Sequence, residues 1–187
     1  MKKSTLILVV ILVVVLIFVI SMIVTYNGLV SENESVSNAF STIDTQLQRR
    51  ADLIPNLVNT VKGYTEHEQA AIDSVTDARA KLSGAQSVSE KSEANTELTS
   101  ALSRLLVVVE NYPNLKADQQ FIALQDELAG TENRITVARK DYNDAVRTYN
   151  THIKTFPTNI FAGIFGFIPI DYFEADESDR EVPEVTF

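Results

Sequence analysis

The chain has 187 residues, enough for one domain with a short appendage. Its net charge at pH 7 is −9 and it contains no stripe of Lys and Arg, which argues against a surface for nucleic acids. Because the chain has no cysteine, disulfide bonds and a lipoprotein anchor are excluded.

An apolar run at residues 6–24, interrupted only by Ser21, is the first feature along the chain. At 1.5 Å per residue, a helix of this run matches the roughly 30 Å hydrocarbon core of a bilayer. The run is longer than the apolar part of a cleaved signal peptide, about 7 to 15 residues, and no obvious cleavage site follows it. We therefore expect residues 1–25 to be a transmembrane anchor that contacts the membrane through residues 6–24.

Positive charges near the anchor predict its orientation. Lys2 and Lys3 precede the apolar run, whereas the next positive residue after it is Arg49. Since Lys and Arg close to a span tend to remain in the cytoplasm, the N-terminus should be cytoplasmic. The sequence thus predicts a single-pass cell-membrane protein with an extracytoplasmic body.

Residues 26–156 carry the pattern of a long-helix bundle. From Val36 to Leu82, apolar residues recur at alternating spacings of four and three, and only Arg50 and Glu68 interrupt them. This pattern is typical of a coiled coil or a long bundle helix, which would measure roughly 70 Å if continuous. The helix has room to begin nearer the membrane, directly after the anchor.

The two charges in this apolar seam need partners if they are buried. We expect them to specify the register of the helices rather than to catalyse a reaction. The third predicted helix offers Glu132 or Asp141 for Arg50, and Arg134 or Arg139 for Glu68.

Pro55 lies inside the same pattern. The heptad phase continues through it, which favours a kink in one helix over a break with Asp52 capping a new helix. A proline at this position leaves the carbonyl of Ala51 without its helical donor, so water or a neighbouring side chain has to supply one.

Two further helices are predicted. Residues 83–87 suit a turn, and an apolar stripe then indicates a helix over residues 88–111. Pro113 marks a reversal, after which apolar residues at helical spacing continue from residue 121 to residue 156. No stretch alternates with period two, so we predict an all-α fold: an N-terminal transmembrane helix and an up-down antiparallel bundle.

Residues 157–187 comprise a Phe-rich segment and an acidic tail, which we expect to be solvated and disordered. Residues 156–173 hold five of the nine phenylalanines and are too short and interrupted to span a bilayer. Their apolar surface has to be hidden against the bundle, between subunits or in a membrane. The candidate interaction residues are Phe156, Ile160, Phe161, Ile164, Phe165, Phe167, Ile168, Tyr172 and Phe173, together with Arg49 and Arg50 of the first helix.

Few residues carry reactive chemistry. The only histidines are His67 and His152, and Ala71 stands where a zinc-binding HExxH motif needs its second histidine. We interpret His67 as part of a solvated helix face and His152 as a packing residue. Tyr142 and Tyr149, one heptad apart, are interpreted as core rings with a hydroxyl at the rim. We expect no catalytic site, metal or cofactor.

Several segments resemble the LemA family of bacterial membrane proteins. They are YNGLV (26–30), AFSTIDTQLQRRADLIPNLVNTVKGYTEHE (39–68), ENYPNLKA (110–117), FIALQDELAGTENRITVARKDYNDAVRTYN (121–150), FPTNIFAGIFGF (156–167) and YFEA (172–175). The resemblance implies a membrane helix with a helical-bundle body, and a short N-terminus outside the cytoplasm, opposite to the orientation that the lysines favour. Some relatives take part in forming membrane organelles and members are often encoded beside membrane metalloproteases, which implies a scaffolding or accessory role.

Two functions follow as expectations. The first is a non-enzymatic, membrane-anchored scaffold that acts through self-assembly, as a homo-oligomer, or through partner membrane proteins. The alternative is a module that binds or remodels lipid through the Phe-rich segment.

Overall fold

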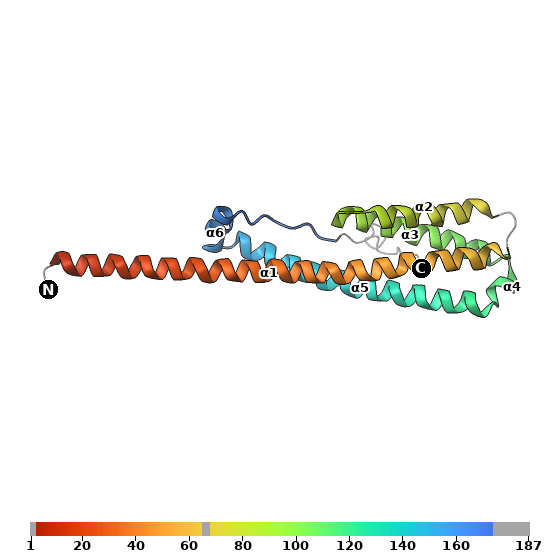
Figure 1. Ribbon diagram of the computed structural model, residues 1–187, viewed down its shortest axis with the longest axis horizontal. Coiled ribbons are helices and arrows are strands. Elements are labelled where there is room, and N and C mark those ends of the chain that lie inside the picture. The colour runs from red at the N-terminus through yellow and green to blue at the C-terminus, as the bar shows by residue number, and fades with distance from the viewer. Residues whose placement is uncertain (1–2, 65–67, 174–187) are drawn as a thin grey trace, which may run out of the picture. The chain divides into compact units, whose positions relative to one another are not determined.

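The computed structural model describes residues 3–64 and 68–173. These residues form helices and no strand (Figure 1), which confirms the all-α fold. The helices are α1 Lys3–Lys62, α2 Gln69–Gly84, α3 Val88–Val109, α4 Pro113–Lys116, α5 Gln119–Lys154 and α6 Thr158–Phe165. The chain divides into two compact units, the first with residues 1–38 and 144–170, the second with residues 39–143 and 171–187. The acidic tail beyond residue 173 lies outside the described residues.

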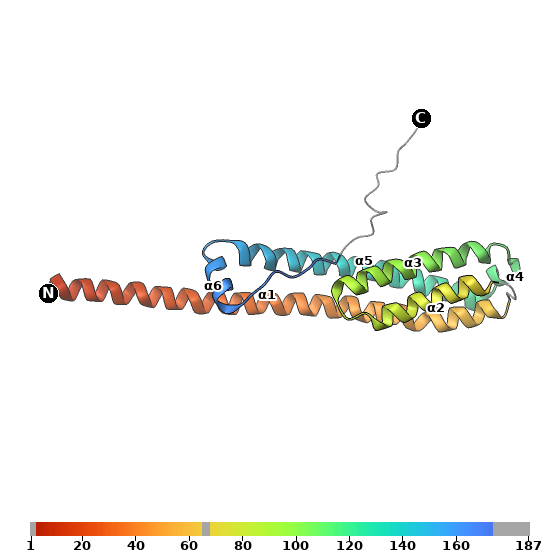
Figure 2. The same ribbon diagram turned by 90° about the horizontal axis from the view of Figure 1, so that it is seen from above.

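The second unit is an up-down bundle. Residues 39–62 of α1 run in one direction, α2 returns, α3 reverses again, and residues 119–143 of α5 return once more (Figure 1). Helices α2 and α3 lie side by side along their length (Figure 2). The largest fully buried side chains of this unit are Tyr142, Phe121, Phe173, Ile43, Leu47, Ile54, Leu57, Leu98, Leu105 and Leu115.

The predicted continuous helix over residues 36–82 is wrong. Helix α1 ends at Lys62, and α2 begins at Gln69 and runs the opposite way. The apolar seam is weakest at this point, because Tyr64 is exposed and the buried position near the start of α2 is Ile72 rather than the expected Ala71. The four-three spacing therefore continues across a chain reversal, because two separate helices each bury an apolar stripe.

Pro55 lies inside α1 and does not end it. The carbonyl oxygen of Ala51 accepts a hydrogen bond of 2.8 Å from Nε of Arg79, which belongs to α2. The prediction that a neighbouring side chain or water has to satisfy this carbonyl is thereby confirmed. The same contact ties α2 to α1.

The later helix boundaries follow local capping chemistry. The hydroxyl of Ser87 accepts from the amide of Glu90, and the carboxylate of Glu90 accepts from the amide of Ser87, which together form a capping box. Helix α3 therefore begins at Val88, as predicted from the turn at residues 83–87. At the next corner, the Asp118 carboxylate accepts from the amide of Phe121 at 3.0 Å, and α5 begins at Gln119.

The first unit contains the N-terminal part of α1, the end of α5 and α6. The side chains of residues 6–20 are exposed, and α1 is long and apolar enough to cross a membrane. Helix α1 also continues without interruption beyond the apolar run, as expected for a helix that begins directly after the anchor. Gly166, with φ of 77°, ends α6 in the left-handed conformation that glycine adopts most readily.

Candidate functional site

The predicted interaction residues of the Phe-rich segment differ in exposure. Phe161 and Phe173 are buried, while Phe165 and Phe167 are half-buried. The exposed residues are Phe156, Ile160, Ile164, Ile168 and Tyr172. The segment therefore has one face against its own chain and another open to its surroundings.

In the first unit, aromatic rings join α6 and the residues after it to α1. The rings of Phe161 and Phe18 are 5.5 Å apart between centroids. The ring of Tyr26 lies edge-on to Phe165 at 4.9 Å and is 5.8 Å from Phe167. These separations fall within the range in which aromatic pairs attract each other beyond simple burial.

Asn150 of α5 holds the main chain that follows α6. Its Nδ2 donates to the carbonyl of Ile170 at 2.8 Å, and its Oδ1 accepts from the amide of the same residue at 2.9 Å. The neighbouring hydroxyl of Tyr149 donates to the carbonyl of Ile168 at 3.1 Å. A helix side chain thus provides the paired donor and acceptor that a neighbouring strand would provide in a sheet.

The second unit contains an equivalent arrangement. Nδ2 of Asn143 donates to the carbonyl of Phe173 and its Oδ1 accepts from the amide of Phe173, both at 2.9 Å. The hydroxyl of Tyr142 donates to the carbonyl of Asp171 at 2.9 Å, and the Arg139 guanidinium lies over the ring of Phe173 at 5.4 Å. We call the two arrangements the Asn150 clamp and the Asn143 clamp.

The tyrosines of both clamps are buried, as expected for core rings, and their hydroxyls are bonded to main-chain carbonyls. Burial, followed by the charge of Asp171, raises the pKa of Tyr142 to about 12. Burial, followed by the charge of Glu32, raises the pKa of Tyr149. Sequence reasoning missed the asparagines, although the repetition of a Tyr-Asn pair after one heptad was a signal for them.

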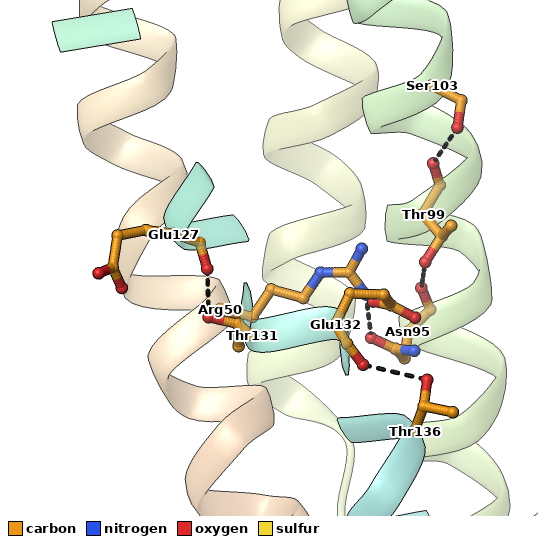
Figure 3. A network of polar contacts seen from close by, with 8 residues as sticks. All are labelled: Arg50, Asn95, Thr99, Ser103, Glu127, Thr131, Glu132 and Thr136. Carbon is orange, nitrogen blue, oxygen red and sulfur yellow. Dashed lines mark hydrogen bonds and ion pairs between the residues drawn. The ribbon is translucent and has the colours of Figure 1, made fainter. Parts of the chain in front are cut away.

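Arg50 is the centre of a polar network inside the bundle. Its guanidinium forms an ion pair with Glu132 of α5, which is one of the two partners predicted from the sequence. It also donates to Oδ1 of Asn95 in α3 at 2.6 Å (Figure 3). Burial lowers the pKa of Arg50, whereas the charge of Glu132 and the hydrogen bond to it act in the opposite direction. The network connects three helices, which fits the expected role in register. Asn95 had not been predicted.

The other charged candidates lie at the surface. Arg49 pairs with Glu127 at 2.7 Å, and both side chains are about half exposed. Glu68 accepts from the hydroxyl of Tyr112 at 3.4 Å, so the structure favours a tyrosine over the two arginines considered from the sequence.

Of the two histidines, the structure describes His152 and not His67. In the first unit, Nδ1 of His152 lies 2.9 Å from a carboxylate oxygen of Glu32. The packing role predicted for His152 therefore includes a polar contact. His67 lies outside the described residues, as does Glu66. Among residues 3–64 and 68–173, no three His, Asp or Glu side chains gather in a way that could hold a metal ion.

A groove of about 400 Å³ lies between α1 and α5 on the surface of the second unit. Its lining residues are Thr42, Gln46, Asn133, Arg134, Val137, Ala138 and Asp141. Val137 is 61% exposed, and Oε1 of Gln46 is buried without a hydrogen-bond partner. The groove combines an open apolar contact with a polar atom that still needs a donor.

The sequence of the chain is similar to a known protein family and to several known proteins. A model of the LemA family matches residues 39–187. Protein LemA of Metamycoplasma hominis is 28% identical over 156 residues, covering 82% of this chain and 71% of that protein. Magnetosome protein MamQ 2 of Paramagnetospirillum magneticum is 26% identical, and magnetosome protein MamQ of Magnetospirillum gryphiswaldense is 24% identical. Each covers 89% of this chain and 70% of the relative. The chain belongs to the LemA family.

Proposed function

We propose that the chain is a non-enzymatic helical scaffold, anchored in the membrane by one span, that brings together copies of itself or partner membrane proteins. The observation that carries this proposal is the extent of α1, which supplies both the apolar run and the first helix of the bundle. No linker therefore separates the apolar run from the first helix of the bundle along the chain. The similarity to MamQ proteins, which are named for the magnetosome, supports an accessory role in a membrane-bound assembly.

The polar interior of the bundle supports a structural use of its charges. Arg50 of α1 bonds to Asn95 of α3 and to Glu132 of α5, which connects three helices. Such contacts fix how helices pack, and they leave the outer surface of the bundle for binding. The groove between α1 and α5 is the surface that we assign to protein contacts, since a helix laid in it would cover the exposed side chain of Val137.

Photo-crosslinking in native membranes tests this assignment. A photoreactive amino acid replaces Val137 in the groove, and a matched variant carries it at Val107, which is 67% exposed on α3. We expect crosslinked products from Val137, to a second copy or to a membrane protein identified by mass spectrometry, and few from Val107. Equal yields at the two positions, or none at either, would contradict the scaffold.

The proposed orientation places the body outside the cytoplasm, in agreement with Lys2 and Lys3. Because the chain has no cysteine, the labelling of a single introduced cysteine reports on which side of the membrane that residue lies. In intact cells, a membrane-impermeant maleimide should label Val107→Cys, which is exposed outside the groove, and leave Ser4→Cys unlabelled. The reverse pattern would assign the body to the cytoplasm.

A further inference from the structure

The segment containing α6 exposes an apolar face and carries no charge. Residues 155–170 contain no Asp, Glu, Lys or Arg. Phe156, Ile160, Ile164 and Ile168 are 75%, 51%, 67% and 72% exposed, which matches or exceeds the 43% to 70% range of the exposed large apolar side chains in residues 6–24. A surface this apolar has to be shielded from water, as the apolar run of the anchor does.

The position of α6 along α1 indicates what shields this surface from water. Phe161 packs on Phe18, which lies inside the apolar run, six residues before its end at Val24. Six residues of helix rise about 9 Å, and helices at a membrane interface bury their apolar face about 5 to 10 Å deep. Phe165 packs on Tyr26, just beyond the run, where aromatic residues favour the headgroup region.

The main chain of this segment is also suited to an environment without water. At the start of α6, the amide of Asn159 donates to the carbonyl of Thr155 at 2.9 Å. At its end, the amide of Phe167 donates to the carbonyl of Ala162 at 3.0 Å. Ile170 is paired through both its amide and its carbonyl with Asn150. These bonds matter because each unpaired main-chain group in hydrocarbon costs several kcal/mol.

We propose that residues 156–170 are immersed in the leaflet on the body side of the membrane, where the exposed face of α6 contacts lipid acyl chains. The segment is then a second membrane contact besides the span. Since it carries no charge, its insertion depends on apolar burial and should not require anionic lipid. At the end of the segment, the Asn150 clamp satisfies the amide and carbonyl of Ile170 and the carbonyl of Ile168.

Depth-dependent fluorescence quenching tests the proposal in the full chain. Ile164→Cys and Ile160→Cys each receive an environment-sensitive fluorophore and are reconstituted in phosphatidylcholine vesicles. Nitroxide groups on the lipid acyl chains should reduce their emission as strongly as that of Ile20→Cys, which lies near the end of the apolar run. Iodide in the water should quench them far less than Val107→Cys, which is exposed on α3 outside the groove. Circular dichroism checks that each variant keeps the helicity of the parent chain.

Quenching by iodide like that of Val107→Cys, without quenching by the nitroxide lipid, would overturn the proposal. A second copy of the chain could cover the same face, so the measurement is repeated at no more than one chain per vesicle. Protection from iodide that persists on dilution supports lipid contact. Protection that is lost on dilution assigns the exposed face of α6 to a second copy and refutes immersion. The crosslinking at Val137 does not involve α6, so failure of either experiment leaves the other proposal standing.

Discussion

Nε of Arg79 donates a hydrogen bond of 2.8 Å to the carbonyl oxygen of Ala51. This carbonyl would bond to the amide of residue 55 in an ordinary helix, but Pro55 has no amide hydrogen. The proline therefore creates an acceptor on α1 that a side chain of α2 can use. A local defect in one helix becomes a specific contact between two.

This relationship predicts that Arg79 and Pro55 are energetically coupled. Arg79→Met should lower the free energy of unfolding by about 1 to 3 kcal/mol, because a part-buried carbonyl loses its donor. In a Pro55→Ala background, the restored amide satisfies Ala51, and the same substitution should cost clearly less. Urea unfolding of the four chains in detergent measures the coupling. Identical costs in both backgrounds would disprove it.

Arg50 and Arg49 are adjacent in sequence, but their substitution should destabilise the bundle to very different extents. Arg50→Met leaves the buried amide of Asn95 without its donor and removes the partner of Glu132, whose side chain is 34% exposed, so we expect a loss of about 1 to 3 kcal/mol. Arg49→Met removes an exposed ion pair, which is worth less than about 1 kcal/mol. The free energies of unfolding of the two variants test this difference. Similar losses would contradict the burial of Arg50 inside the bundle.

The apolar pattern was sufficient to predict the fold class and, to within about two residues, the bounds of α3 and α5, because each of these helices buries one stripe. It missed the reversal after Lys62, because the spacing of apolar residues records burial and does not record the direction of the chain. Glu68 interrupted the pattern near that point, yet a single charged residue does not end a helix as clearly as the Gly- and Ser-containing turn at residues 83–87. Periodicity alone could not separate one helix from two antiparallel ones.

The candidate surfaces were predictable in part for a different reason. The Phe-rich segment was conspicuous by composition, whereas the division between buried Phe161 and exposed Ile164 depends on which face of α6 meets α1. Asn143 and Asn150 were not predicted because asparagine side chains bond main chain in many contexts. Their role depends on an extended segment some twenty to thirty residues later in the sequence.

The two clamps should be separable by hydrogen exchange. Asn150→Ala removes both bonds to Ile170, and exchange of that amide should accelerate roughly tenfold or more, since each bond contributes about 0.5 to 1.5 kcal/mol. The amide of Phe173, held by Asn143, should change little. Asn143→Ala should give the reciprocal result. Acceleration of both amides in either variant would mean that the segment detaches as one piece.

Tyr142 should make the stability of the bundle sensitive to alkaline pH. Its pKa is raised to about 12 by burial and by the charge of Asp171, compared with about 10 for tyrosine in an unfolded chain. A raised pKa means that the neutral hydroxyl stabilises the fold fully below pH 10. This contribution is lost as the pH rises from 10 through 12, because the unfolded chain releases the proton first. Urea midpoints measured between pH 9 and 11 should therefore fall, and they should fall less in Tyr142→Phe. If Tyr142→Phe instead removes a tyrosinate absorbance that forms before pH 11, the hydroxyl is not held as the Asp171 contact requires.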